Sequence, residues 1–252
     1  MVAAEFDRGA ALLKYRFPAI DRKNWRPAVA AVMEDVGFFD LLEIDHSYNT
    51  RQITGRDIRV LKMRSNRLAE PTQAGELISE LETLATDLTS DSEVDFDRLY
   101  GALFEGITNT RHHAYPARFR FNHTGQWWAT GAVDKRLRMI SAIIYDQGIT
   151  IPASLPSSWM SGKLEGLFGS TWSARDGATI AAAIAVSRSS TGEPHRGLGL
   201  AEMEAFMETC RSGRLRILSR HGEYLAEVGK SPENFTHRNQ VQGTLVQWDV
   251  TV

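Results

Sequence analysis

The residues best suited to chemistry in this chain are Glu105 and Asn109, which lie four positions apart. Apolar side chains recur at helical spacing over residues 99–107, which predicts a helix with one buried stripe. Residues four apart on a helix project from one face, about one turn apart. A carboxylate there can orient or deprotonate a nucleophile, and an amide oxygen can complete the shell of Mg²⁺. Glu105 is therefore the candidate catalytic residue and Asn109 the candidate metal ligand, although two solvated polar residues would have the same spacing.

Asp146 is a candidate binding residue because it ends a strongly apolar stretch, residues 139–145, that predicts a central strand. Carboxyl ends of strands often present ligands. Gly148 follows two positions later. A strand-terminating turn would use the same residue types, so that interpretation stays open.

Two glycines, Gly197 and Gly199, precede a predicted helix, with Leu198 between them and Arg196 before them. Bare backbone N–H groups and the helix dipole attract phosphate oxygens at such a position. Arg196 adds a cationic contact. A glycine turn between a loop and a helix is the alternative.

The order of these signals along the chain resembles the GHKL, or Bergerat-fold, ATPases, which include gyrase, histidine kinases, MutL, the large heat-shock chaperone and the anti-sigma-factor serine kinases. Glu105-x-x-x-Asn109, followed by His113-Ala114-Tyr115, is most similar to the anti-sigma serine kinases. The resemblance covers roughly residues 95 to 252.

The resemblance implies that the chain binds ATP and Mg²⁺, with Asn109 on the metal and Glu105 beside the attacking oxygen. It assigns Asp146 to the adenine amine and Gly148 to close approach of the backbone to the base. Thr244, which begins the last predicted strand, would hydrogen-bond the adenine or the nearby carboxylate. A threonine in a strand is also ordinary without such a role.

Residues 151–196 are expected to form a lid over the nucleotide, because Gly, Ser and Pro flank a helical centre. Thr150 stands where the family has the second glycine of Asp-x-Gly-x-Gly, so the base of the lid is stiffer or differently angled. The attacking oxygen belongs either to water, in an ATPase, or to a protein serine, in a kinase. The alternative is a nucleotide-gated module that binds a protein partner without chemistry.

The expected fold class is α/β (α+β), in two parts. Residues 91–252 are expected to form a two-layer sandwich, with helices on one face of a mixed β-sheet. Residues 1–90 are expected to form a small α/β module, faintly similar to a STAS-type regulatory domain. The alternative for this part is an extension that covers the ATPase core or forms a homodimer. The polar stretch around residue 90 marks the boundary.

The sequence also predicts individual elements. In the first part these are a strand at Leu12–Phe17, a helix at Trp25–Phe39, a strand at Ile58–Met63 and a helix from Pro71. In the second part they are strands at 126–133 and 136–145, a helix at 200–210, a hairpin turning at His221-Gly222 and a closing strand at 244–252.

Composition narrows the function classes. The chain has 252 residues, 42% of them hydrophobic and 24% charged, as in a globular protein. A net charge of −2 gives no basic field for nucleic acid, so we expect no nucleic-acid partner. The single cysteine, Cys210, fits a reducing compartment, and no apolar run is long enough to span a bilayer. We therefore expect a cytoplasmic protein with no membrane contact.

Overall fold

The computed structural model describes residues 1–14, 24–41, 57–86, 94–117, 121–155, 175–189 and 199–251. The helices are α1 Val2–Leu13, α2 Pro27–Asp35, α3 Phe38–Leu41, α4 Pro71–Ala85, α5 Phe96–Asn109, the π-helical turn η2 Thr110–Ala114, α6 Ile151–Ser154, α8 Asp176–Ser189, α9 Gly199–Ala205 and the 3₁₀ turn η4 Phe206–Thr209. The strands are β1 Ile58–Val60, β2 Arg64–Asn66, β3 Trp127–Asp134, β4 Met139–Asp146, β5 Gly213–Glu227 and β6 Glu233–Thr251.

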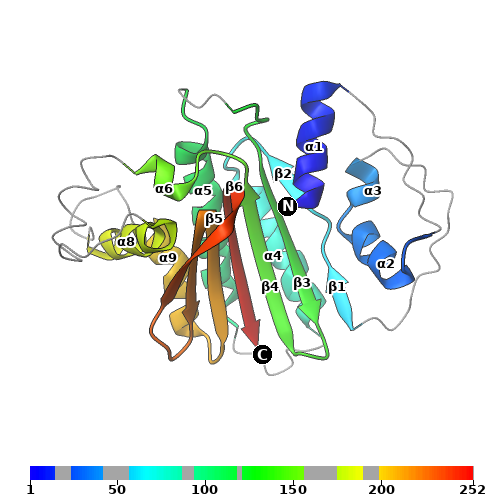
Figure 1. Ribbon diagram of the computed structural model, residues 1–252. Helices are drawn as coiled ribbons and strands as arrows, with labels where there is room; N and C mark the ends of the chain where they lie inside the picture. Colours follow the sequence, from blue (N-terminus) through cyan, green and yellow to red (C-terminus); the bar gives the residue numbers. More distant parts are fainter. Residues whose placement is uncertain are drawn as a thin grey trace.

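The strands form one six-stranded sheet in the order β1-β3-β4-β6-β5, and β2 also pairs with β3 (Figure 1). Every pairing between the described strands is antiparallel. The expected α/β class is confirmed. The expected mixed sheet is wrong for the described strands, which pair only antiparallel. The short β3–β4 and β5–β6 connections explain the difference, since parallel neighbours need a longer crossover.

The main core lies between one face of the sheet and helices α4, α5, α8 and α9. Neighbouring strand residues point to opposite faces, so Trp127 faces this core while Trp128 faces away from it. Trp128 and Tyr145 pack against Ala4 of α1 on the second face. Helix α1 therefore covers part of the second face. It lies outside residues 91–252, the part for which helices on one face were expected.

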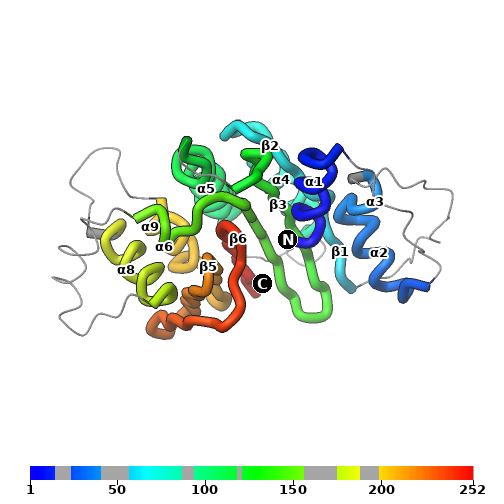
Figure 2. The backbone as a smooth tube through the Cα atoms, turned by 45° about the horizontal axis from the view of Figure 1, so that its top comes forward, coloured from blue at the N-terminus to red at the C-terminus, as the bar shows by residue number. Residues whose placement is uncertain are grey.

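Residues 57–86 share the sheet and the core of the residues that follow. Strands β1 and β2 both pair with β3, and Leu81 of α4 is fully buried in the same core as Leu103 of α5. These residues therefore extend one layer rather than forming a sheet of their own. The expected boundary near residue 90 falls largely outside the described residues. Figures 1 and 2 show α1, α2 and α3 beside the β1 end of the sheet and α8 beside the β5 end.

Two N-terminal predictions differ from the structure. The predicted strand at Leu12–Phe17 is wrong at its start, because residues 12 and 13 end α1; the rest lies outside the described residues. The predicted helix at Trp25–Phe39 is divided into α2 and α3. Gly37, with φ of 76°, separates the two helices in a conformation that favours glycine.

The predicted hairpin at His221-Gly222 is also wrong, because β5 runs through these residues and turns only before β6. The register with β6 shifts around Arg220, which has φ of 55°. A Cβ at Gly222 would lie 2.7 Å from the Ile180 side chain of α8. This glycine therefore allows α8 to approach a bulged strand, a role that glycine also serves in sheets.

Candidate functional site

Helix α5 presents Glu105 and Asn109 at the border of its buried stripe. Asp95 caps the helix by accepting a hydrogen bond from the Arg98 backbone N–H at 3.0 Å, as its residue type predicts. Leu103 and Ile107 are fully buried beneath the helix. The Glu105 and Asn109 side chains are half-buried, so the packed stripe fixes their direction.

Gly199, the first residue of α9, lies directly against both side chains. A Cβ at Gly199 would lie 2.6 Å from Asn109 Nδ2 and 2.7 Å from Glu105 Oε2. A side chain at this position would displace both polar groups, since real Cβ contacts are not that short. The structure therefore brings Gly199 into contact with two predicted site residues that lie about ninety positions earlier in the sequence.

The Asn109 amide has unused hydrogen-bonding capacity. Its Nδ2 atom is buried and has no hydrogen-bond partner among the described residues. Buried polar atoms are normally paired, and an unpaired one calls for an explanation. Rotation of the amide exchanges nitrogen and oxygen with little change of shape, so the group can offer either a donor or a metal ligand at this point.

The pKa of Glu105 is raised, mainly because burial disfavours its charged form. The carboxylate of Glu202 on α9 raises it further, and His112 lowers it. A carboxylate with a raised pKa is a better proton acceptor than an ordinary surface glutamate. Glu202 was not a sequence candidate, because nothing in the helix pattern indicates that α9 packs against α5.

Asp146 is buried at the end of β4, where burial raises its pKa to about 7. Three donors act against that shift: the backbone N–H of Gly148 at 2.8 Å, the backbone N–H of Thr244 and the Thr110 hydroxyl. The Thr110 oxygen is also 3.0 Å from the Gly106 carbonyl, and its single proton serves one acceptor at a time. A carboxylate has about four acceptor sites, so Asp146 can accept one more hydrogen bond.

Gly148 and Gly243 allow the backbone around Asp146 to pack closely. A Cβ at Gly148 would lie 2.2 Å from the carbonyl oxygen of Ala114, at the end of η2. A Cβ at Gly243 would lie 2.0 Å from the Asp146 carbonyl oxygen, and Gly243 has a positive φ of 80°. Gly148 therefore allows the backbone after β4 to pack against η2, the turn that follows α5.

Thr244 pairs with Asp146 across the β4–β6 ladder, so the two predicted site residues are neighbours in the sheet. Its Oγ1 lies 2.9 Å from Oγ of Ser219, a fully buried residue of β5. Ser219 also accepts a hydrogen bond from the backbone N–H of Ile151, where α6 begins. Neither Thr110 nor Ser219 was a sequence candidate, since single hydroxyl residues carry no spacing signal.

Arg196, Gly197 and Leu198, the other predicted phosphate-binding residues, lie outside the described residues. So does most of the predicted lid, except α6 and α8. Ile180 and Ile184 of α8 are buried in the main core, so this helix is part of the packed layer. The described residues contain no group of three or more acidic, His or Cys side chains that could hold a metal by themselves.

No known family model matches the chain, and no curated protein matches it either. Among the described helices, none is both long and apolar enough to cross a membrane.

Proposed function

We propose that this chain binds Mg²⁺–ATP in the manner of the GHKL proteins and uses Glu105 in hydrolysis or phosphoryl transfer. The observation that carries the proposal is the contact of Gly199 with both Glu105 and Asn109. These residues belong to two sequence motifs about ninety positions apart. Two helices can pack closely without polar side chains at their point of contact, so the polar groups beside Gly199 call for another explanation.

The Bergerat fold is part of this proposal. It is supported by a sheet whose one face carries α5 and α9, with Asp146 beneath the end of α5. Thr150 remains a departure from the family pattern. It is buried, immediately precedes α6, and leaves its hydroxyl without a partner among the described residues.

ATP is the proposed nucleotide because the Asp146 carboxylate can accept one more hydrogen bond than the protein donors supply. An ionised carboxylate accepts hydrogen bonds only, so it pairs with the amine of adenine and repels the carbonyl oxygen of guanine. Thr244 supports this role by holding the carboxylate through its backbone N–H.

Asn109 is the proposed protein ligand of Mg²⁺. Magnesium commonly keeps several waters and binds through few protein groups together with substrate phosphates. A single unpaired amide fits that pattern better than a cage of carboxylates would, and the described residues hold no such cage. When bound, Mg²⁺ would neutralise charge on the phosphates.

Glu105 is the proposed base. It would take the proton from the attacking oxygen as that oxygen bonds to the γ-phosphorus and the bond to ADP breaks. The raised pKa of Glu105 favours this transfer. Water as the nucleophile gives free phosphate, and a protein serine gives a phosphoserine.

The test uses γ-labelled ATP, with the protein alone and with candidate protein acceptors, with and without Mg²⁺. Free phosphate indicates an ATPase, and protein-bound label indicates a kinase. ATP binding without either product would leave a nucleotide-gated binding module. Absence of ATP binding would refute the proposal as a whole.

A further inference from the structure

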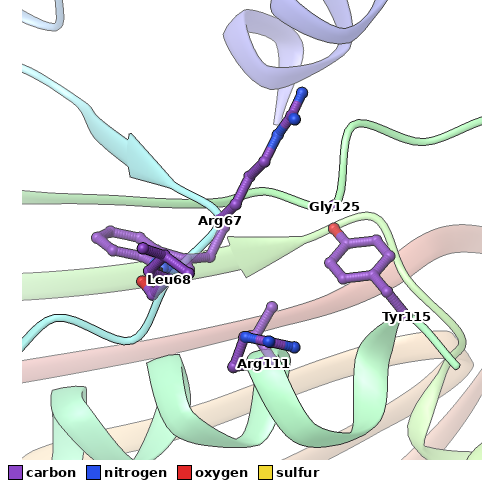
Figure 3. A pocket seen from close by; sticks show the side chains of 7 residues that line it. Arg67, Leu68, Arg111, Tyr115 and Gly125 are labelled. Atoms are coloured by element: carbon purple, nitrogen blue, oxygen red, sulfur yellow. Dashed lines mark hydrogen bonds between the residues drawn. The ribbon is translucent and has the colours of Figure 1, made fainter.

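A cavity of about 230 Å³ lies beside the end of α5. Thr110, whose hydroxyl donates to Asp146, lines its inner side. Arg111 lines it, and Arg111 follows Asn109 by two positions, which is roughly half a turn around the helix. Figure 3 shows Arg67 on the upper side of this space, Arg111 on the lower side and Tyr115 on the right. The cavity therefore faces away from Gly199 and its contacts.

Hydrogen bonds fix the wall formed by the turn after β2. The backbone N–H groups of Arg67 and Leu68 donate to Oδ1 of Asn66 at 2.6 and 3.1 Å. The Leu68 carbonyl accepts from Nε1 of Trp127 at 2.9 Å. This wall is thus preformed, as ligand sites usually are.

Tyr115 forms an equally fixed wall on the other side. Its hydroxyl donates to the Gln126 carbonyl at 2.5 Å and accepts from the Gln147 backbone N–H at 3.0 Å. Its ring stacks on His123 with the ring centres 4.6 Å apart. The aromatic ring, rather than the hydroxyl, is what remains to contact a ligand.

The charge around the cavity has one sign. Arg67 and Arg111 are exposed, neither has an ion pair within the described residues, and no acidic residue lines the cavity. By contrast, Arg64 three positions earlier forms ion pairs with Glu76 and Glu80. The described residues 110–117 contain Arg111 and two histidines but no Asp or Glu. Two guanidinium groups at a preformed cavity attract oxyanions.

We propose that this cavity binds a small organic anion, a phosphate ester or a carboxylate. Arg67 and Arg111 would bind its oxygens, and Leu68 and the Tyr115 ring would contact its apolar body. Leu68 is 51% exposed, which leaves apolar surface for such a contact. The cavity is smaller than the roughly 300–1,000 Å³ of common ligand sites, so the ligand is small.

Calorimetry with phenyl phosphate, benzoate and phenol tests the proposal on the full chain at low ionic strength. At least one of the two anions should bind, and phenol should bind at least about tenfold more weakly, because a charged hydrogen bond is lost. Binding of phenyl phosphate alone would identify a phosphate site, and binding of benzoate alone a carboxylate site. If neither anion binds, or phenol binds equally well, the proposal is wrong.

Variants locate the bound probe. Arg67→Ala and Arg111→Ala should each weaken anion binding by about tenfold. Arg136→Ala, which changes an exposed arginine in the β3–β4 turn, should leave it unchanged. Asn109→Ala should also leave it unchanged. Unaltered binding in both arginine variants, or loss in Asn109→Ala, would contradict the proposal; the outcome does not depend on whether the protein binds ATP.

Discussion

The protonation of Asp146 gives a quantitative prediction for nucleotide binding. Burial raises the pKa of this carboxyl to about 7 in the nucleotide-free protein. The ionised carboxylate accepts a stronger hydrogen bond from the adenine amine than the protonated carboxyl does, because charge-assisted hydrogen bonds are roughly twice as strong as neutral ones. Roughly one tenth of the molecules are ionised at about pH 6 and roughly nine tenths at about pH 8. ATP affinity should therefore increase by up to about tenfold over this range.

Asp146→Asn provides the control, because the phosphates of ATP also titrate near neutral pH. The substitution keeps the size of the side chain and removes the titrating group. Its effect on ATP affinity should be roughly 10-fold or more at about pH 8, from the loss of a charged hydrogen bond. The ratio of wild-type to variant affinity cancels the titration of ATP, and it should fall by up to about tenfold at about pH 6.

The same group affects stability in the absence of nucleotide. A pKa raised on folding contributes stability that is full below the unfolded value of 3.8 and is lost as pH rises through about 7. The rise of about three units corresponds to at most roughly 4 kcal/mol. Asp146→Asn should thus gain stability relative to wild type between about pH 5 and pH 8.

Competition binding of ATP and GTP, together with denaturant unfolding at both pH values, checks these expectations. Wild type should bind ATP at least about tenfold more tightly than GTP, and the ratio of the two affinities should be smaller in Asp146→Asn. A wild-type to variant affinity ratio that does not change with pH would refute the assignment of Asp146 to the base.

Three other substitutions test separate contacts. Glu105→Ala should retain ATP affinity, but its turnover, measured as labelled phosphate, should fall roughly 10²–10⁴-fold. The exposed control Glu208→Ala should keep wild-type turnover. More than half of wild-type turnover in Glu105→Ala would exclude Glu105 as the base. Gly199→Val should abolish ATP binding in calorimetry while the circular dichroism spectrum stays native, because its Cβ would occupy the space of the Glu105 and Asn109 side chains. Normal ATP binding by this variant would contradict a role of the Gly199 contact in the site. Glu5 of α1 accepts a hydrogen bond from Nε2 of Gln147 at 2.7 Å, next to Asp146, the proposed contact to the base. Glu5→Ala should therefore weaken ATP binding several-fold and Glu5→Gln much less. Equal effects of the two substitutions would show that this hydrogen bond does not position the site.

The parts of the site that could be predicted are those set by local spacing. The helical period of α5 places Glu105 and Asn109 on one face, and Asp95 marks the start of the helix. Both facts depend only on nearby residues. The apolar run before Asp146 likewise predicts a central strand, and β4 does lie between β3 and β6.

The parts that could not be predicted depend on distant contacts. His221-Gly222 has the composition of a turn, but packing against Ile180 gives Gly222 a different purpose within a continuous strand. The apolar residues at the start of the chain suit a strand or a helix end, and only the contact of Ala4 with Trp128 shows that α1 covers the second face of the sheet. Short apolar runs leave that choice open until tertiary packing is known.

The direct test of the central claim is calorimetric titration of the full chain with Mg²⁺–ATP. Wild type is compared with Asn109→Ala and with Asn122→Ala, which changes the side chain of an exposed asparagine outside α5. Wild type and Asn122→Ala should bind with equal affinity and near one-to-one stoichiometry. Asn109→Ala should lose Mg²⁺-dependent binding, because water must replace the amide oxygen on the metal. Equal Mg²⁺–ATP affinity in all three proteins would refute the metal assignment, and no binding by wild type would refute the nucleotide site itself.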